Sequence, residues 1–243
     1  MINSVARKLT WLGVAVVFLA SAGCAGRPSL RSVSKPSESK RQYLGLEKVA
    51  VLPLKNIGGD KGAEDQAMTI IVSELNISGT FEEVEDPHYV GSVLKALKLR
   101  NVDDLDLETV QKMGSEMNAQ ALLFGDIHAW GLGEGDAAAM HVSMTLTLMD
   151  TQTGKPLWIG SGARRASFTW SRALGLNEGP AALELARQVV VSLMKELKHE
   201  IGKHREDELV RIKAEEESKL KAAAEAEKRR LEEMIQQEEN QGK

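Results

Sequence analysis

The chain has 243 residues, a formal net charge of −4 and a single cysteine. This acidic balance argues against nucleic acid as a partner, because phosphate backbones are bound mainly by clustered Lys and Arg side chains. A lone cysteine also excludes an intramolecular disulfide and any metal or redox site built from several cysteines.

Residues 1–23 have the layout of a secretory signal peptide. Arg7 and Lys8 form the positive segment, residues 9–20 are apolar, and small residues follow. The apolar run is too short to span a bilayer, which takes about 20 residues. We therefore predict that this segment is removed from the mature protein.

The only cysteine, Cys24, follows these small residues directly and resembles the lipobox cysteine of bacterial lipoproteins. The resemblance implies that Cys24 is acylated and becomes the first mature residue. Ser21 stands where the motif usually carries Leu. The uncharged Ala25 implies sorting to the periplasmic face of the outer membrane. The alternative is an ordinary signal peptide that contains a cysteine.

Residues 24–44 are rich in Ser, Lys, Arg and Pro and lack hydrophobic periodicity. Such a composition buries too little apolar surface to fold, so we predict a disordered tether. A flexible chain of about 20 residues has an r.m.s. span on the order of 25 Å. The tether is therefore expected to keep the folded domain near the membrane.

The folded domain is predicted over residues 45–202 and opens with a βα unit. Residues 49–54 are a continuous apolar run, typical of a strand that is buried on both faces. The next segment carries the apolar stripe of an amphipathic helix, with Met68, Ile71, Val72 and Leu75. Residues 80–84 predict a second strand, parallel to the first through a right-handed crossover.

Two more helices are predicted before the next strand. Asp86 is expected to cap a helix that has Pro87 at its first position. The apolar residues of that helix are Val90, Val93, Leu94 and Leu97. A third helix over residues 104–117 is expected to direct three side chains inward, those of Leu107, Val110 and Met113.

Three consecutive antiparallel strands are predicted over residues 119–168, at 121–127, at 141–149 and from 157 onward. The second strand alternates strictly, with one apolar face made by Val142, Met144, Leu146 and Leu148. Between the second and third strands, Asp150 and Gly154 predict a short hairpin turn. Trp158 is expected to be a core residue of the third strand.

The last element is predicted to be a very long helix. Its first part carries a docking stripe, with Ala182, Ala186, Val189, Val190, Leu193 and Leu197. Residues 203–243 form a charged extension supported by acid-to-base pairs four residues apart. Its sparse apolar residues are candidate partner contacts: Leu209, Ile212, Leu220, Leu231 and Ile235. The extension is either a coiled coil or a lone solvated helix, and we expect its removal after Lys203 to leave the domain's stability unchanged.

The resulting order, β-α-β-α-α-β-β-β-α, defines an α/β fold with a mixed sheet. Four segments together resemble a family of envelope lipoproteins: residues 49–56, 81–84, 118–125 and 148–158. This family includes the curli assembly lipoprotein, penicillin-binding protein activators and the N-terminal domain of the periplasmic β-propeller protein of the Tol–Pal system. The resemblance implies a non-catalytic scaffold or adaptor without a cofactor.

A secretion pore of the curli type is not expected, although a ring-forming export accessory remains an alternative. Each strand of a membrane barrel needs about 9–11 residues. The connection at residues 131–139 is too short for such a hairpin, and residues 170–180 are neither long nor apolar enough.

No nucleotide-binding or hydrolase motif is present in the sequence. If Ile127 paired with Val142, His128 would lie opposite His141, with Asp126 diagonal on the same face. Two imidazoles and a carboxylate can bind Zn²⁺, so a metal-dependent enzyme is the competing function class. The other interpretation is a cross-strand histidine pair with no ligand.

These patterns together predict a lipid-anchored module in the periplasm, working in cell-envelope assembly. Activation of a peptidoglycan synthase and an accessory role in export are the two forms considered. The expected partners are the outer membrane and either an envelope protein or a second copy, bound through the C-terminal helix.

Overall fold

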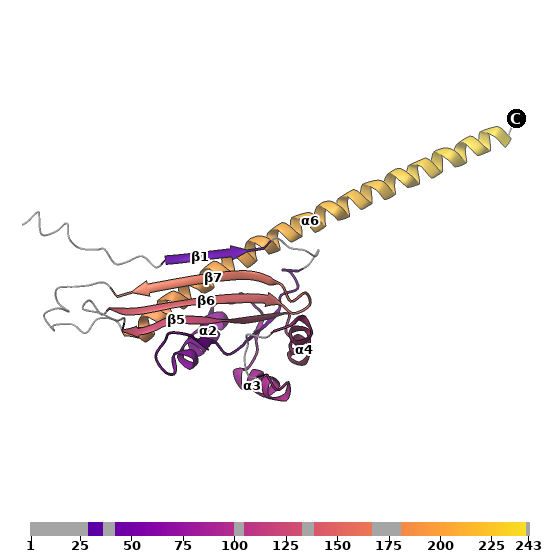
Figure 1. Ribbon diagram of the computed structural model, residues 1–243. Coiled ribbons are helices and arrows are strands. Elements are labelled where there is room, and N and C mark those ends of the chain that lie inside the picture. The colour runs from indigo at the N-terminus through magenta and orange to yellow at the C-terminus, as the bar shows by residue number, and fades with distance from the viewer. Residues whose placement is uncertain (1–28, 36–41, 100–104, 133–138, 167–180, 242–243) are drawn as a thin grey trace, which may run out of the picture.

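The computed structural model describes residues 29–35, 42–99, 105–132, 139–166 and 181–241 (Figure 1). The strands are β1 (Ser29–Ser34), β2 (Lys48–Val51), β3 (Lys55–Asn56), β4 (Glu83–Val84), β5 (Ala121–Leu132), β6 (Met140–Asp150) and β7 (Pro156–Arg165). The helices are α2 (Ala63–Ser78), α3 (Pro87–Ala96), α4 (Leu107–Met117) and α6 (Ala182–Gln241). No described helix is long and apolar enough to cross a membrane.

The strands form one 7-stranded mixed sheet in the order β1-β7-β6-β5-β2-β4, with β3 also paired to β5. Strand β2 is parallel to β4 and to β5, whereas β5, β6, β7 and β1 are antiparallel neighbours. The predicted α/β class, the parallel pair and the three-stranded meander are thus confirmed. Strands β1 and β3 are additional to the predicted order.

Two hydrophobic cores lie on opposite faces of the sheet. Val49 and Val51 of β2 belong to a core with α2 and α6, whereas Ala50 belongs to a second core with α3 and α4. Successive strand residues point to opposite faces, so this alternation shows that the helices cover the sheet on both sides. The α6 side is the larger core, and all four predicted apolar residues of β6 are buried there.

The predicted cap of α3 and the predicted hairpin turn are both present, whereas one predicted core residue of α4 is exposed. The Asp86 carboxylate caps α3 by accepting from the backbone N–H groups of His88 and Tyr89. The Asp150 carboxylate accepts from two turn N–H groups, and Gly154 takes a φ of 65°. Leu107, predicted to point inward, is 49% exposed because it is the first residue of α4 and lies beside the hairpin glycine.

The predicted register of the first meander hairpin is wrong by two residues. Ile127 pairs with Met144 instead of Val142, and His128 is bypassed at an irregularity between Ile127 and Ala129. His141 therefore faces Gly131. The two-residue shift runs along β5 from Ala121 opposite Asp150, and because strand side chains alternate with a period of two, it leaves the same apolar residues facing the core. The irregularity after Ile127 adds a further shift of one residue.

The prediction of a disordered tether over residues 24–44 is wrong for Ser29–Ser34. This segment forms β1 and pairs along β7 from Ser29 opposite Ala163 to Ser34 opposite Trp158. An unpaired strand edge offers free backbone N–H and C=O groups, so a polar segment can join it without an apolar pattern of its own. Tyr43 is also fully buried, so the folded part begins earlier than residue 45.

Helix α6 stays attached to the domain beyond the predicted boundary at Gly202. Ile201 and Glu208 are both buried, and His204 stacks on the Tyr43 ring. The helix passes through Gly202 without a break. In Figure 1 it crosses the sheet and then projects beyond it as a single straight rod.

Candidate functional site: the α6 arm and its junction with the domain

The predicted partner-contact residues all lie on the outer part of α6, which we call the arm (residues 209–241). Leu209 is 44% exposed, Leu220 72%, Leu231 52% and Ile235 56%, while Ile212 is partly buried. Apolar side chains exposed to this degree have no core of their own in the monomer. The structure places these residues on a continuous helix, and their role as partner contacts stays a prediction.

The arm's apolar residues recur at a regular spacing. Leu209, Leu220 and Leu231 are each eleven residues apart, and so are Ile212, Ala223 and Met234. Eleven residues are about three turns plus 20°, so these side chains form one almost straight stripe along the helix. An eleven-residue period favours a nearly straight or right-handed pairing with another helix rather than the left-handed heptad coil.

Ion pairs one turn apart support the rest of the arm surface. Glu215 lies 3.3 Å from Lys219, and Glu217 lies 2.7 Å from Lys221. Such exposed pairs contribute about 0.3–0.5 kcal/mol each. They maintain helical structure in water, but they leave the apolar stripe uncovered.

The junction between arm and domain is built by two charged residues that sequence reasoning missed. The Arg205 guanidinium donates to three backbone carbonyls, those of Tyr43, Leu46 and Thr80, at 3.0, 2.6 and 3.1 Å. The buried Glu208 carboxylate accepts from the N–H groups of Tyr43 and Leu44 at 2.9–3.1 Å. Together they bind the N–H groups of Tyr43 and Leu44 and the carbonyls of Tyr43 and Leu46, in a segment that belongs to no strand.

Tyr43 is the aromatic part of the same junction. Its ring stacks on His204 with centroids 4.4 Å apart, and its hydroxyl donates to the carbonyl of Lys35. Burial, followed by the charges of Glu208 and Glu200, raises the pKa of Tyr43 to about 12. The phenol is therefore held neutral, in the form that can donate its hydrogen bond.

A small groove lies where the arm leaves the domain. It is lined by Leu44, Gly45, Glu47, Leu209 and Ile212. Two of the predicted contact residues, Leu209 and Ile212, therefore belong to a composite surface of arm and domain. The other three belong to the arm alone.

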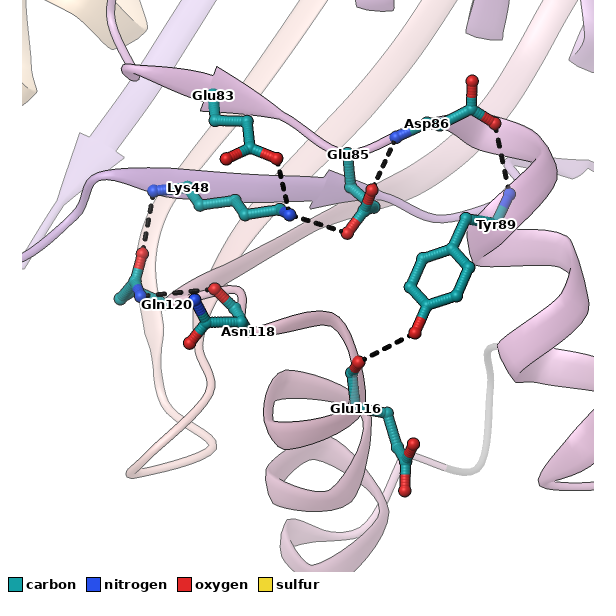
Figure 2. Close-up of polar contacts among 8 residues, drawn as sticks. All are labelled: Lys48, Glu83, Glu85, Asp86, Tyr89, Glu116, Asn118 and Gln120. Atoms are coloured by element: carbon teal, nitrogen blue, oxygen red, sulfur yellow. Dashed lines mark hydrogen bonds and ion pairs between the residues drawn. The ribbon is translucent and has the colours of Figure 1, made fainter.

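A second polar cluster, at the β4 edge of the sheet, is structural (Figure 2). Lys48 lies between Glu83 and Glu85 at 2.6 and 2.9 Å, and these two carboxylates raise the pKa of Lys48. Close by, the Tyr89 hydroxyl donates to the Glu116 carbonyl, which links α3 to α4. Lys48 pairs with both carboxylates, and Glu85 also accepts from the backbone N–H of Asp86, so the cluster ties β2 to β4 and to the start of α3.

The predicted metal candidates are not brought together. His128 contacts the Thr145 hydroxyl at 3.0 Å, and Thr145 contacts Ser161 at 2.9 Å. Partial burial, followed by the nearby charge of Arg165, lowers the pKa of His141. No group of three His, Cys, Asp or Glu side chains able to hold a metal occurs among the described residues. The observed register thus sets His128 and His141 on different pairs of residues, whereas Cys24 lies outside the described residues.

The sequence around Arg205 and Glu208 does not indicate that their side chains are buried, because both residues stand in a run of charged residues. Only one feature distinguished them. Ile201, Arg205, Glu208 and Ile212 follow at spacings of four, three and four, which continues the docking stripe of the inner helix.

The chain is thus a mixed α/β domain that carries a long charged helix. Within it, residues 24–163 match the sequence profile of the peptidoglycan-synthase activator LpoB family. The chain belongs to this family. The LpoB part of the resemblance is thereby confirmed, whereas the similarity to the curli and Tol–Pal proteins is not. A comparison with curated protein sequences finds no match.

The solved structures with a related fold share little sequence identity with this chain. The PelC dodecamer from Paraburkholderia phytofirmans is 18% identical with a TM-score of 0.46, covering 71% of this chain and 98% of that one. Lipoprotein GNA1162 from Neisseria meningitidis is 21% identical with a TM-score of 0.43, covering 54% and 91%. The LpoB C-terminal domain from Escherichia coli is 18% identical with a TM-score of 0.37, covering 49% and 82%. Similarity at this level carries no argument about function.

Proposed function

We propose that this protein is a lipid-anchored, non-catalytic regulator of cell-envelope assembly that activates a peptidoglycan synthase from the periplasmic face of the outer membrane. Membership of the peptidoglycan-synthase activator family is the observation that carries the proposal. The polar clusters of the described residues, at the β4 edge and at the junction, are satisfied by protein groups and so agree with a binding role. Cys24, directly after the signal segment, supplies the anchor.

The arm is the proposed contact with the synthase. Its stripe of Leu220, Leu231 and Ile235 is exposed, and an amphipathic helix of this kind binds by laying its apolar face in a groove of a partner. Arg205 and Glu208 fix the base of the arm to the domain, so the arm is presented as one rigid element. A helix that is already formed loses less conformational entropy on binding than a disordered segment.

Truncation after Ala214 tests this contact, because it removes most of the stripe and keeps both junction residues. We expect the truncated chain to fold with an unchanged melting temperature and to lose binding to the purified synthase together with the stimulation of glycan polymerisation. If it bound and stimulated as the full chain does, the contact would have to lie on the α/β domain.

Point variants distinguish binding through the apolar stripe from a general effect of charge on the helix. Leu220→Asp with Leu231→Asp places charge in the stripe, whereas Ala222→Asp with Gln236→Asp places the same charge on the far side of the helix. Only the first pair should weaken binding, by about tenfold or more. Equal effects of both pairs would indicate a general charge effect, and a smaller oligomer in the first pair alone would indicate self-association instead.

The anchor is tested separately. Cys24→Ser should move the protein from the outer-membrane fraction to the soluble or uncleaved fraction. Fractionation identical to that of the parent would contradict the lipoprotein assignment and leave the arm proposal standing.

A further inference from the structure

Strand β1 and helix α6 run in the same direction along the domain. The Ser32 hydroxyl donates to Glu196 at 2.8 Å, and Ser34 contacts Glu200 at 2.5 Å and His204 at 2.9 Å. Later residues of β1 therefore meet later residues of α6. In Figure 1 the start of β1 and the start of α6 lie at one end of the sheet, and the arm leaves from the other end.

Pairing of β1 with β7 shortens the stretch of chain between Cys24 and the folded domain. Cys24 and Ser29 are five residues apart in the sequence, and a chain spans at most about 3.6 Å per residue. If Cys24 carries the lipid, Ser29 lies within about 18 Å of the membrane surface. The predicted tether of residues 24–44 would have allowed several times this distance.

The end of the sheet that begins at Ser29 carries cationic and apolar side chains. Ser29 pairs with Ala163, next to Arg164 and Arg165 at the end of β7. The ion pairs in the described part of the chain engage neither arginine. At the same end, Leu132 closes β5 with 68% of its surface exposed.

The first turn of α6 lies at the same end of the sheet as the start of β1 (Figure 1). Gly162 of β7 lies against Val189 and Leu193, and Leu183 is about two turns before Val189. Leu183 is 48% exposed. Among the described residues, this end also carries acidic groups, which include Asp60, which lies against Gly131, Glu64, whose carboxylate accepts from Asn56, and Glu184, whose carboxylate accepts from Gln188.

We infer that this end of the domain, formed by Leu132, Arg164, Arg165 and Leu183, rests on an anionic phospholipid surface and orients the arm away from the membrane. Arginine guanidinium groups bind phosphate in two-point contacts, and leucines at such an edge enter the boundary between headgroups and acyl chains. The inference rests on the lipid anchor of the proposed function. In the described part of the chain, the cross-strand neighbour of Arg165 is His141, and no carboxylate forms an ion pair with either arginine.

The orientation changes what the arm can reach. Helix α6 has 60 residues, so it is about 90 Å long at 1.5 Å per residue. Its beginning lies at the proposed membrane-facing end and its arm at the opposite end. The stiff helix, rather than a disordered tether, would thus carry the contact surface across the periplasm toward a partner.

Site-directed labelling of the lipidated full chain in vesicles tests the orientation directly. Acylation consumes the only thiol, so Leu132→Cys and Lys219→Cys each provide a single labelling site. A fluorophore at position 132 should be quenched at least twofold by a headgroup-spin-labelled lipid, whereas one at position 219 should be unaffected. Absence of quenching at 132, or equal quenching at both positions, would overturn the inference while the vesicle-bound protein still confirms the anchor.

Binding of the unlipidated chain tests the chemistry. Without its lipid, the protein should partition onto vesicles that contain phosphatidylglycerol and not onto pure phosphatidylcholine vesicles. Arg164→Glu with Arg165→Glu should lower the partition coefficient by about tenfold or more, since each basic contact contributes about 1 kcal/mol. Lys219→Glu with Lys221→Glu makes the same charge change on the arm and should have no effect. No anionic preference, or equal losses in both pairs, would contradict the lipid contact.

Discussion

The two halves of α6 are one continuous helix with opposite relations to the rest of the chain. In the inner half, Leu193, Leu197 and Ile201 are buried against the sheet. In the arm, Leu220 and Leu231 are more than half exposed. The apolar residues are of the same kind, so what differs is whether another element covers them. Helical continuity alone therefore does not show where a domain ends.

The halves are also held in different ways. The inner half is stabilised by apolar burial and by the contacts of Arg205 and Glu208 with residues 43–46. The arm relies on intrinsic helix propensity and on exposed ion pairs that each contribute little. Matched substitutions on the two sides of the junction should therefore have very different effects on the free energy of unfolding.

The largest difference is expected for leucine truncation. Leu193→Ala removes a fully buried side chain and should cost about 2–5 kcal/mol, whereas Leu220→Ala should change stability by less than about 0.5 kcal/mol. Urea unfolding of the two variants measures both values. A cost above 1 kcal/mol for Leu220→Ala would mean that the arm is already covered in the isolated protein.

The next effect concerns the junction. Glu208→Gln keeps the size of the side chain but weakens two buried contacts with backbone N–H groups, which should cost about 1–3 kcal/mol. Glu216→Gln, on the exposed arm, is the matched control and should be neutral. If both variants unfolded at the same urea concentration, the junction would not contribute to stability.

Alkaline pH should weaken the same junction. The pKa of Tyr43 is raised from its ordinary value of 10 to about 12, so the folded state retains the phenol proton more tightly than the unfolded state does. This contribution is complete below pH 10 and is lost as the pH rises from 10 to 12. The raised pKa of Lys48 acts in the same direction above pH 10.5.

Melting temperatures at pH 9 and pH 11 isolate the tyrosine contribution. Tyr43→Phe should lose fewer degrees between these two values than the parent protein does, with the remainder due to Lys48 and other groups. An equal loss in both proteins would show that the Tyr43 hydroxyl is not responsible.

The smallest effect is expected at Gly202. A Cβ added there would meet no other atom, and alanine favours a helix interior over glycine by about 1 kcal/mol. Gly202→Ala should therefore raise stability by up to this amount without changing lipid or partner binding. A loss of activity with a gain in stability would instead indicate that the helix bends at Gly202 when it works.

The sequence determined the elements whose signals are local. The alternation of β6, the Asp86 cap and the hairpin between Asp150 and Gly154 follow from neighbouring residues, because side-chain direction, capping and turn geometry depend on a few consecutive positions. The docking stripe of α6 was predictable in the same way. Family membership agrees with the resemblance that these segments carry.

Tertiary structure decided what depends on a distant partner. Ser29–Ser34 became a strand because β7 offered a free edge, although the segment has no strand pattern of its own. A two-residue shift in register and a bulge at His128 separate His128 from His141, and a register is fixed by the pairing of two strands rather than by either alone. Glu208 is buried because the backbone of residues 43–44 needs an acceptor, and no local pattern records that need.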